Sequence, residues 1–160
     1  MKKIILMSLL MFAALGCMCR AVSAQDSCVC NPFISTPDRW ETQVRSQLRR
    51  QALVLNVLAD GYIEEAYLPF IRSMRQNQYQ DIKYRLVEGV TYVFTGACDN
   101  DCHDLDFKLF SDSTKIREDV ASDDMPAVVF RPAWTGTYTL RVVMANCNRG
   151  PCRYGVSVFK

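Results

Sequence analysis

The stretch Gly136-Thr137-Tyr138-Thr139-Leu140-Arg141-Val142-Val143-Met144 decides the fold class, because apolar side chains stand at every second position. Tyr138, Leu140 and Val142 are apolar, while Thr139 and Arg141 between them are polar. Successive side chains of a β-strand point to opposite faces of a sheet. The pattern therefore predicts a strand with one buried face and one face in contact with water.

The same period of two residues runs through the rest of the chain from Tyr79 onward. Turn-forming residues separate the apolar runs, among them Gly89 and Pro132. The alternating or β-branched segments are 82–86, 92–96, 105–109, 127–130, 138–144 and 154–158. Six or seven short strands at roughly ten-residue spacing predict a mainly β fold, an antiparallel β-sandwich whose sheets pack over one core.

The segment that precedes the strands has the period of an α-helix. Ser35-Thr36-Pro37-Asp38 is typical of a helix start, with a capping hydroxyl, an early proline and an early acid. Asp60-Gly61 is typical of a helix end. The apolar stripe between them consists of Trp40, Val44, Leu48, Ala52, Leu55 and Ala59. We expect this helix to pack on the sandwich along the stripe.

Two further features of this region yield local predictions. Glu41 and Arg45 are four residues apart, which favours an ion pair on the helix surface. The last turns are apolar on nearly every side, which predicts that this end is buried. The residues concerned are Leu53, Val54, Val57 and Leu58. Residues 62–78 are interrupted by Pro69, and we interpret them as a short helix followed by a loop.

The first 24 residues have the three-part layout of a secretory signal peptide. A basic start at residues 1–3 precedes an apolar run over residues 4–16, and Val22-Ser23-Ala24 suits signal peptidase. That run is short for a membrane span, and no later stretch reaches the roughly 20 apolar residues that a spanning helix needs. Removal leaves 136 residues, which we divide into a helical segment (25–78) and a β-sandwich domain (79–160).

An alternative is lipoprotein processing at Cys17, because Ala14-Leu15-Gly16-Cys17 resembles a loose lipobox. A chain lipidated there would keep Cys19 as an odd thiol in an oxidising space. Cleavage after Ala24 instead leaves six cysteines, an even set. We therefore expect a secreted bacterial protein, periplasmic or extracellular, without a lipid anchor.

The mature chain is close to neutral. Lys2, Lys3 and Arg20 leave with the signal peptide, so 16 basic and 17 acidic residues remain, a net charge of −1. Such a chain has no basic field to attract nucleic acid or an anionic membrane. We expect neither a nucleic-acid partner nor a transmembrane segment after signal removal.

The six cysteines form three close pairs: Cys28 with Cys30, Cys98 with Cys102, and Cys147 with Cys152. In an exported protein the pairs predict local disulfides that staple loops, although a crossed bridge such as Cys98–Cys147 stays open. Two close pairs also suit a four-thiolate zinc site. Cys98–Cys102 followed by His103 is one residue longer than a haem attachment motif, and Cys28–Cys30 could serve redox chemistry.

Clustered carboxylates in two loops are the strongest sign of an ion. They repel one another unless they are solvated, hydrogen-bonded or bridged by a hard cation such as Ca²⁺. The candidate calcium ligands are Asp99, Asp101, Asp104, Asp106, Asp123 and Asp124. An EF-hand is excluded, because its twelfth position would be Phe110 instead of glutamate. The alternative is that these acids accept backbone N–H bonds in turns, with Asp106 as the inward acid of a strand.

Three motifs in the strand region resemble a known family. They are Asp-Leu-Asp-Phe-Lys-Leu-Phe at 104–110, Asp-Asp-Met-Pro at 123–126 and Thr-Gly-Thr-Tyr-Thr-Leu-Arg-Val at 135–142. Over about residues 80–160 the chain resembles the bacterial pre-peptidase C-terminal domain. The resemblance implies a jelly-roll-like β-sandwich that is non-catalytic, is usually attached to secreted enzymes and sometimes binds calcium or matrix. This chain departs from the pattern by its helical N-terminal segment, its paired cysteines and its lack of a catalytic domain.

The sequence favours binding over catalysis. It contains no Gly-x-Ser-x-Gly, no His-Glu-x-x-His and no phosphate-binding glycine loop, and His103 is its single histidine. We therefore expect an exported, non-catalytic β-sandwich, calcium-stabilised, that recognises a protein or polysaccharide. The alternatives are a subunit of an envelope or extracellular assembly that docks through its N-terminal helix, and a small cysteine-based redox or metal protein.

Overall fold

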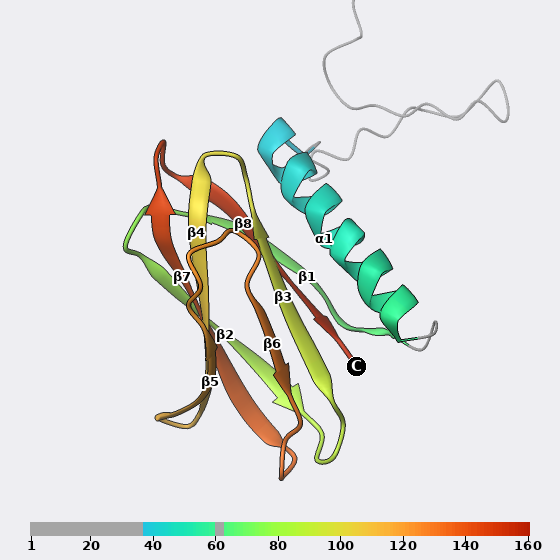
Figure 1. The fold of residues 1–160 in the computed structure, drawn as a ribbon. Helices are drawn as coiled ribbons and strands as arrows, with labels where there is room; N and C mark the ends of the chain where they lie inside the picture. The colour runs from blue at the N-terminus through green and yellow to red at the C-terminus, as the bar shows by residue number, and fades with distance from the viewer. Residues whose placement is uncertain (1–36, 60–62) are drawn as a thin grey trace, which may run out of the picture. The chain divides into compact units, whose positions relative to one another are not determined.

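A computed structural model describes residues 37–59 and 63–160, and within them it contains one helix and eight strands (Figure 1). The signal peptide (1–24), the lipoprotein alternative at Cys17, the pair Cys28–Cys30 and the expected helix end Asp60-Gly61 lie outside the described residues. The elements are α1 (Arg39–Leu58), β1 (Glu65–Met74), β2 (Tyr79–Leu86), β3 (Tyr92–Cys98), β4 (Cys102–Ser111), β5 (Thr114–Asp119), β6 (Ala127–Phe130), β7 (Gly136–Cys147) and β8 (Cys152–Phe159).

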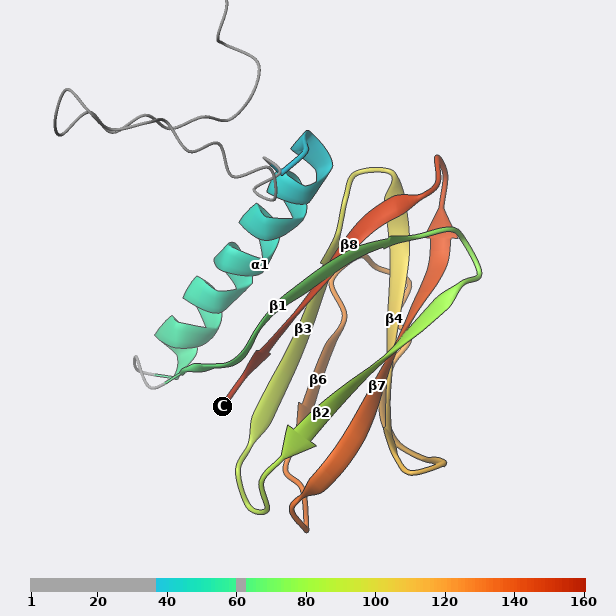
Figure 2. The ribbon, with the colours of Figure 1, turned by 180° about the vertical axis from the view of Figure 1, so that it is seen from behind.

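The strands form two four-stranded sheets, which confirms the predicted antiparallel β-sandwich with an N-terminal helix. One sheet has the order β1-β8-β3-β6 and the other β2-β7-β4-β5, and all paired strands are antiparallel. Figures 1 and 2 show the two layers from opposite sides, with α1 beside the layer that contains β8 and β3. In β7 the predicted alternation holds, since Tyr138, Leu140 and Val142 are all buried in the core between the sheets.

The prediction of a short helix and loop over residues 62–78 is wrong, because β1 occupies Glu65–Met74. The strand pairs with β8, with Phe70 opposite Val156 and Met74 opposite Cys152. Proline is tolerated in an edge strand or at a break in register, and Pro69 lies where the register shifts between Tyr67 and Phe70. The sheet residues therefore begin before the expected boundary at Tyr79.

Strand β5 is a further element that the sequence pattern did not reveal. Its residues Thr-Lys-Ile-Arg-Glu-Asp include a single apolar side chain, Ile116. It lies at the edge of its sheet and pairs with β4 alone, with Leu109 opposite Arg117. Edge strands are often charged, a feature that opposes pairing with other chains and removes the apolar alternation on which prediction depends.

The N-terminal half of α1 is anchored to the outer face of the sheet that contains β8. Val44 is fully buried and Leu48 is 4% exposed, and both pack with Ala97 of β3. A Cβ atom on Gly155 of β8 would lie 2.8 Å from Leu48 Cδ1 and from Val44 Cγ1. Small residues on the strands therefore allow the helix to lie close to the sheet, which confirms the predicted stripe at these two positions.

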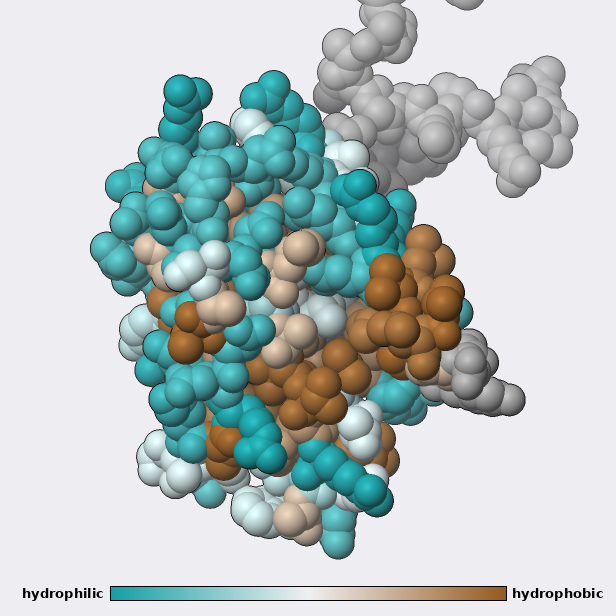
Figure 3. Space-filling view, viewed as in Figure 1, coloured by the Kyte–Doolittle hydropathy of each residue, from teal (hydrophilic) through white to brown (hydrophobic). Residues whose placement is uncertain are grey.

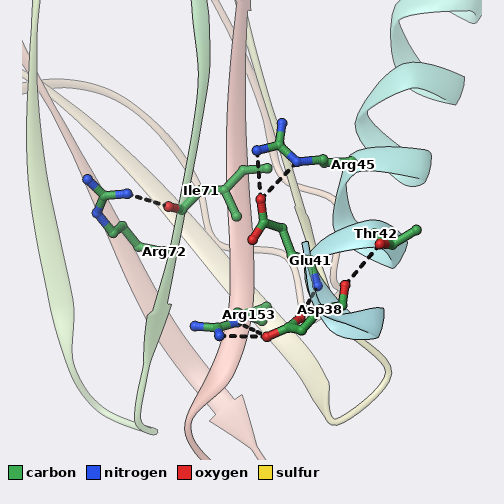
Figure 4. A network of polar contacts seen from close by, with 7 residues as sticks. All are labelled: Asp38, Glu41, Thr42, Arg45, Ile71, Arg72 and Arg153. Atoms are coloured by element: carbon green, nitrogen blue, oxygen red, sulfur yellow. Dashed lines mark hydrogen bonds and ion pairs between the residues drawn. The ribbon is translucent and has the colours of Figure 1, made fainter. Parts of the chain in front are cut away.

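Polar contacts at the start of α1 reinforce this anchor (Figure 4). Asp38 is the N-cap: its Oδ1 accepts from the Glu41 backbone N–H at 2.7 Å, and its Oδ2 accepts from Arg153 Nη2 of β8 at 2.7 Å. Both groups hold the pKa of Asp38 below its ordinary value. The predicted ion pair between Glu41 and Arg45 is confirmed, at 2.7 Å.

The prediction that the last turns of α1 are buried is wrong. Leu53, Val54, Val57 and Leu58 are 66%, 58%, 77% and 76% exposed. The sheet-facing stripe continues through Ala52 and Leu55, which are half-buried, so the other apolar residues lie on sides of the helix that no described part of the chain covers. In residues 37–59 and 63–160, no helix has the length and apolar character needed to cross a membrane.

Candidate binding site beside helix α1

A cavity of about 580 Å³ lies between α1, β3 and the chain that leads into β6. We call it the α1 groove. Its lining residues are Gln47, Arg50, Gln51, Val54, Leu55, Thr95, Asp124, Met125 and Ala127. Figure 3 shows hydrophobic surface on both sides of it, on the helix and on the neighbouring strands. A concave, mostly apolar site with a few polar groups is the usual form of a ligand pocket.

The sandwich positions the floor of the groove by strand alternation. Phe94 of β3 points into the core, so its neighbour Thr95 lies on the outer face beneath α1. Thr95 pairs in register with Ala127 of β6, which brings both residues to the groove. Gln51 of α1 reaches the same strand, where its Nε2 donates to the Gly96 carbonyl oxygen at 2.8 Å.

Three polar side-chain atoms, two on α1 and one on β3, are buried without a hydrogen-bond partner among the described residues. They are Gln47 Oε1, Gln51 Oε1 and Thr95 Oγ1. All three residues line the groove, and Thr95 as a whole is 5% exposed. Buried polar atoms of native proteins nearly always have partners, so three orphans around one cavity make it a candidate site for polar groups from outside the described chain.

An exposed apolar surface adjoins the groove. We define the α1 patch as Leu53, Val54, Val57 and Leu58, of which Val54 also lines the groove. Met125 on the opposite rim and Val129 of β6 are also more than half exposed. Single exposed apolar residues are normal, whereas a contiguous group of this kind is typical of an interaction surface.

The helix that carries the patch is basic. Between Arg39 and Leu58 it contains four arginines and one glutamate. Arg45 is paired with Glu41, while Arg49 and Arg50 make no salt bridge within the described part of the chain. The surface therefore combines apolar side chains with two arginines that form no salt bridge among the described residues, and the Asp124 carboxylate lines the same groove as Arg50.

The paired cysteines lie at one end of the sandwich, at the ends of β3, β4, β7 and β8, where Cys102 is opposite Cys147. Cys98 is bonded to Cys102 and Cys147 to Cys152, with Cα–Cα distances of 5.9 and 6.1 Å, which confirms local pairing and excludes the crossed bridge. No described cysteine is free. In this disulfide-bonded form the four sulfurs supply no thiolate for the zinc site or the haem attachment considered above.

Asp99 takes the turn-forming role among the candidate calcium ligands. Its Oδ1 accepts from the Asp101 backbone N–H at 3.2 Å and its Oδ2 from the Arg153 backbone N–H at 2.6 Å. Burial raises the pKa of Asp99, and these N–H bonds oppose that rise. The carboxylate therefore joins the Cys98–Cys102 turn to β8, and His103 beside it is exposed.

Asp104 and Asp106 lie on the outer face of β4, so the expectation that Asp106 points inward is wrong. The buried residues of this strand are Leu105 and Phe107, which fixes the phase of the alternation. Burial raises the pKa of both acids, and the nearby Asp123 carboxylate raises that of Asp104 further. Asp104 Oδ1 is buried without a partner among the described residues.

The structure brings Asp123 near Asp104 but places Asp124 elsewhere. Asp123 Oδ1 accepts from the Met125 backbone N–H at 2.9 Å, while Asp124 lines the α1 groove. In the part of the chain that the structure describes, no three His, Cys, Asp or Glu side chains are grouped so that they could hold a metal ion. Calcium binding stays a prediction.

Sequence reasoning did not find the polar floor of the groove. Thr95, Gln47 and Gln51 are polar residues in a strand and a helix, a pattern that normally indicates exposure. Their burial arises because a separate element, α1, crosses the strand that carries Thr95. The α1 patch does leave a signal in the sequence, the helix end that is apolar on nearly every side, but the same pattern predicts burial.

Comparison of the chain with protein-family models and with curated proteins finds no match. The resemblance of residues 80–160 to the pre-peptidase C-terminal domain therefore stays a prediction. The α1 groove and the adjoining α1 patch are the surface features from which we propose a function below.

Proposed function

We propose that this chain is an exported, non-catalytic binding module that docks a partner protein on the C-terminal half of α1. The observation that carries the proposal is the α1 patch, four apolar side chains that are each more than half exposed beside the α1 groove. Leaving such a surface in water forgoes about 25 cal/mol for each Å² that a partner could cover.

The charge of the helix indicates the chemistry of the partner. Arg49 and Arg50 lie on the helix that carries the patch and make no salt bridge within the described residues. A partner surface with apolar residues in the centre and carboxylates at the rim would complement this arrangement. We therefore infer an acidic protein surface as the occupant, in preference to a polysaccharide.

Two disulfides and the signal-like N-terminus support an extracellular or periplasmic setting for this encounter. Disulfides persist in oxidising compartments and are rare in the cytosol. The rest of the sandwich would then be the rigid base that holds α1 in position. No catalytic role is needed for any residue of the groove.

Site-specific photo-crosslinking in cells of the source organism tests the proposal. A photoreactive residue in place of Val57 should yield one predominant protein adduct, and the same residue in place of Thr139, on the other sheet, should not. Leu53→Asp should remove the adduct, whereas Lys83→Asp, an exposed change on β2, should keep it. Adducts of equal yield from both positions, adducts only between two copies of this chain, or adducts only to lipid would contradict a specific protein partner.

A further inference from the structure

Thr95, a residue of the groove floor, has a buried hydroxyl group that the protein itself does not use. Thr95 is 5% exposed and its Oγ1 has no hydrogen-bond partner among the described residues. An unsatisfied buried polar group destabilises the folded state, and valine would fill the same volume without one. A threonine beneath an open cavity is therefore explained if an occupant supplies the missing hydrogen bond.

The other unpaired polar groups of the groove are acceptors, which favours an occupant that carries a donor. Gln51 Nε2 donates to the Gly96 carbonyl oxygen at 2.8 Å, which fixes the amide and leaves Oε1 as an unpaired acceptor. Gln47 Oε1 is a second unpaired acceptor, and the Asp124 carboxylate, which also lines the groove, can only accept when ionised. An N–H or O–H group could pair with any of these acceptors, whereas a carbonyl on the occupant would have to accept from the Thr95 hydroxyl or the Arg50 guanidinium instead.

The side chains that form the walls of the groove favour a flat, apolar group such as an aromatic ring. Val54, Leu55 and Ala127 are apolar, and Met125 offers a polarizable sulfur of the kind that makes favourable contacts with aromatic rings. Arg50 also lines the groove, and a guanidinium stacks on aromatic faces. The volume of about 580 Å³ leaves room for a large side chain together with the backbone that carries it.

We propose that the α1 groove receives an aromatic side chain with an N–H or O–H donor, tryptophan above all, from the partner protein that docks on the α1 patch. This inference rests on the proposed function. Tryptophan and tyrosine are enriched among the residues that dominate protein interfaces, typically in central pockets. An aliphatic side chain would fill the apolar walls but would leave the acceptors of the floor unpaired.

Nuclear magnetic resonance titration of the purified protein with small probes tests the inference without the partner. N-acetyl-tryptophanamide should shift the signals of Thr95, Ala127 and the Gln51 side-chain amide. Its analogue methylated at the indole nitrogen lacks the donor and should bind about fivefold more weakly, the loss expected for one net hydrogen bond. N-acetyl-leucinamide should be weaker still.

Matched variants locate the probe. Thr95→Val should bind N-acetyl-tryptophanamide as weakly as wild type binds the methylated analogue. Ser157→Ala should leave the affinity unchanged, because Ser157 lies opposite Thr95 on the same sheet face but lines a separate depression on the other side of α1. Ala127→Trp should fill the groove and abolish binding.

Equal affinity for the two indole probes, no binding of either probe, or shifts that map outside the groove would overturn the inference. A Val57 adduct without probe binding would leave the proposed function standing and remove this inference alone. If the probe binds in a Thr95-dependent way but no protein adduct forms, the groove would still be a site for an aromatic group with a donor. A partner protein would then be rejected as the molecule that supplies this group.

Discussion

Both halves of α1 carry apolar side chains, but the surroundings of those side chains are opposite. The first half buries Val44 and Leu48 against Ala97 and Gly155 and is joined to β8 through Asp38 and Arg153. The second half exposes four apolar side chains as the α1 patch. An apolar residue in this helix is therefore structural or available for binding according to what lies opposite it, and composition alone does not distinguish the two.

The largest contrast is expected from the same substitution in each half. Leu48→Ala should lower the free energy of unfolding by about 2 to 4 kcal/mol, because it opens a cavity under the helix. Leu58→Ala should change it by less than about 0.5 kcal/mol, because Leu58 is exposed. Urea denaturation followed by circular dichroism measures both values, and the comparison fails if the two variants lose similar stability.

The close approach of the first half to β8 can be disturbed from the strand. Gly155→Ala should destabilise the fold by about 1 to 2 kcal/mol, since the new methyl group would meet Leu48 and Val44 at 2.8 Å. Gly136→Ala is the control, because its Cβ would meet Trp134, an exposed side chain, at 3.3 Å. A Gly155→Ala variant as stable as wild type would show that the helix is not held tightly against β8.

Substitution of Thr95, which lies under the second half of α1, should change the free energy of unfolding in the opposite direction. Thr95→Val should raise the free energy of unfolding by about 1 kcal/mol, because it removes an unpaired buried hydroxyl at nearly constant volume. Thr139→Val, at a half-exposed position of β7, should change it by less than about 0.5 kcal/mol. A destabilised Thr95→Val protein would mean that the hydroxyl already has a partner within the fold.

The smallest effect on stability is expected at the ion pair between Asp38, at the start of α1, and Arg153 of β8. The pKa of Asp38 is lowered below 3.8, so its carboxylate binds protons less tightly in the folded state than in the unfolded chain. Its contribution is therefore present above pH 3.8 and is lost as the pH falls through the folded pKa. Asp38→Asn should lower the melting temperature slightly at neutral pH. As the pH is lowered below 4, the melting temperature of this variant should decrease less than that of the wild type.

Arg153→Gln provides the control for this ion pair. It removes the same interaction from β8, so it should produce a similar reduction, and the double variant should add little to either single change. If the two changes are additive in the melting temperature at neutral pH, Asp38 and Arg153 do not act together.

The local sequence pattern was sufficient to predict an element where one face of it is buried and the other is exposed to solvent. The alternation in β7 and the close spacing of Cys98–Cys102 and Cys147–Cys152 predicted what the structure contains. Local pattern failed for β1, because Pro69 suggested an interruption, whereas an edge strand tolerates it. It also failed for Asp106, because the pattern of acids suggested that this side chain points inward from β4 when it lies on the outer face.

The candidate site could be predicted less well than the fold, because it is made by elements far apart in the chain. Gln47 of α1 and Thr95 of β3 line the same groove only after β3 has paired with β6 and α1 has docked on that sheet. The α1 patch was visible as an apolar helix end, but the sequence does not state whether the chain covers it. Tertiary contacts decide that question.

Hydroxyl-radical footprinting of α1, in the purified protein and in cells of the source organism, tests the central claim most directly. The account predicts that Leu53, Val57 and Leu58 are labelled strongly in the purified protein and are protected in cells, while Val44 and Leu48 remain unlabelled in both. Protection of the α1 patch in the purified protein, or equal labelling of the patch in both samples, would contradict it.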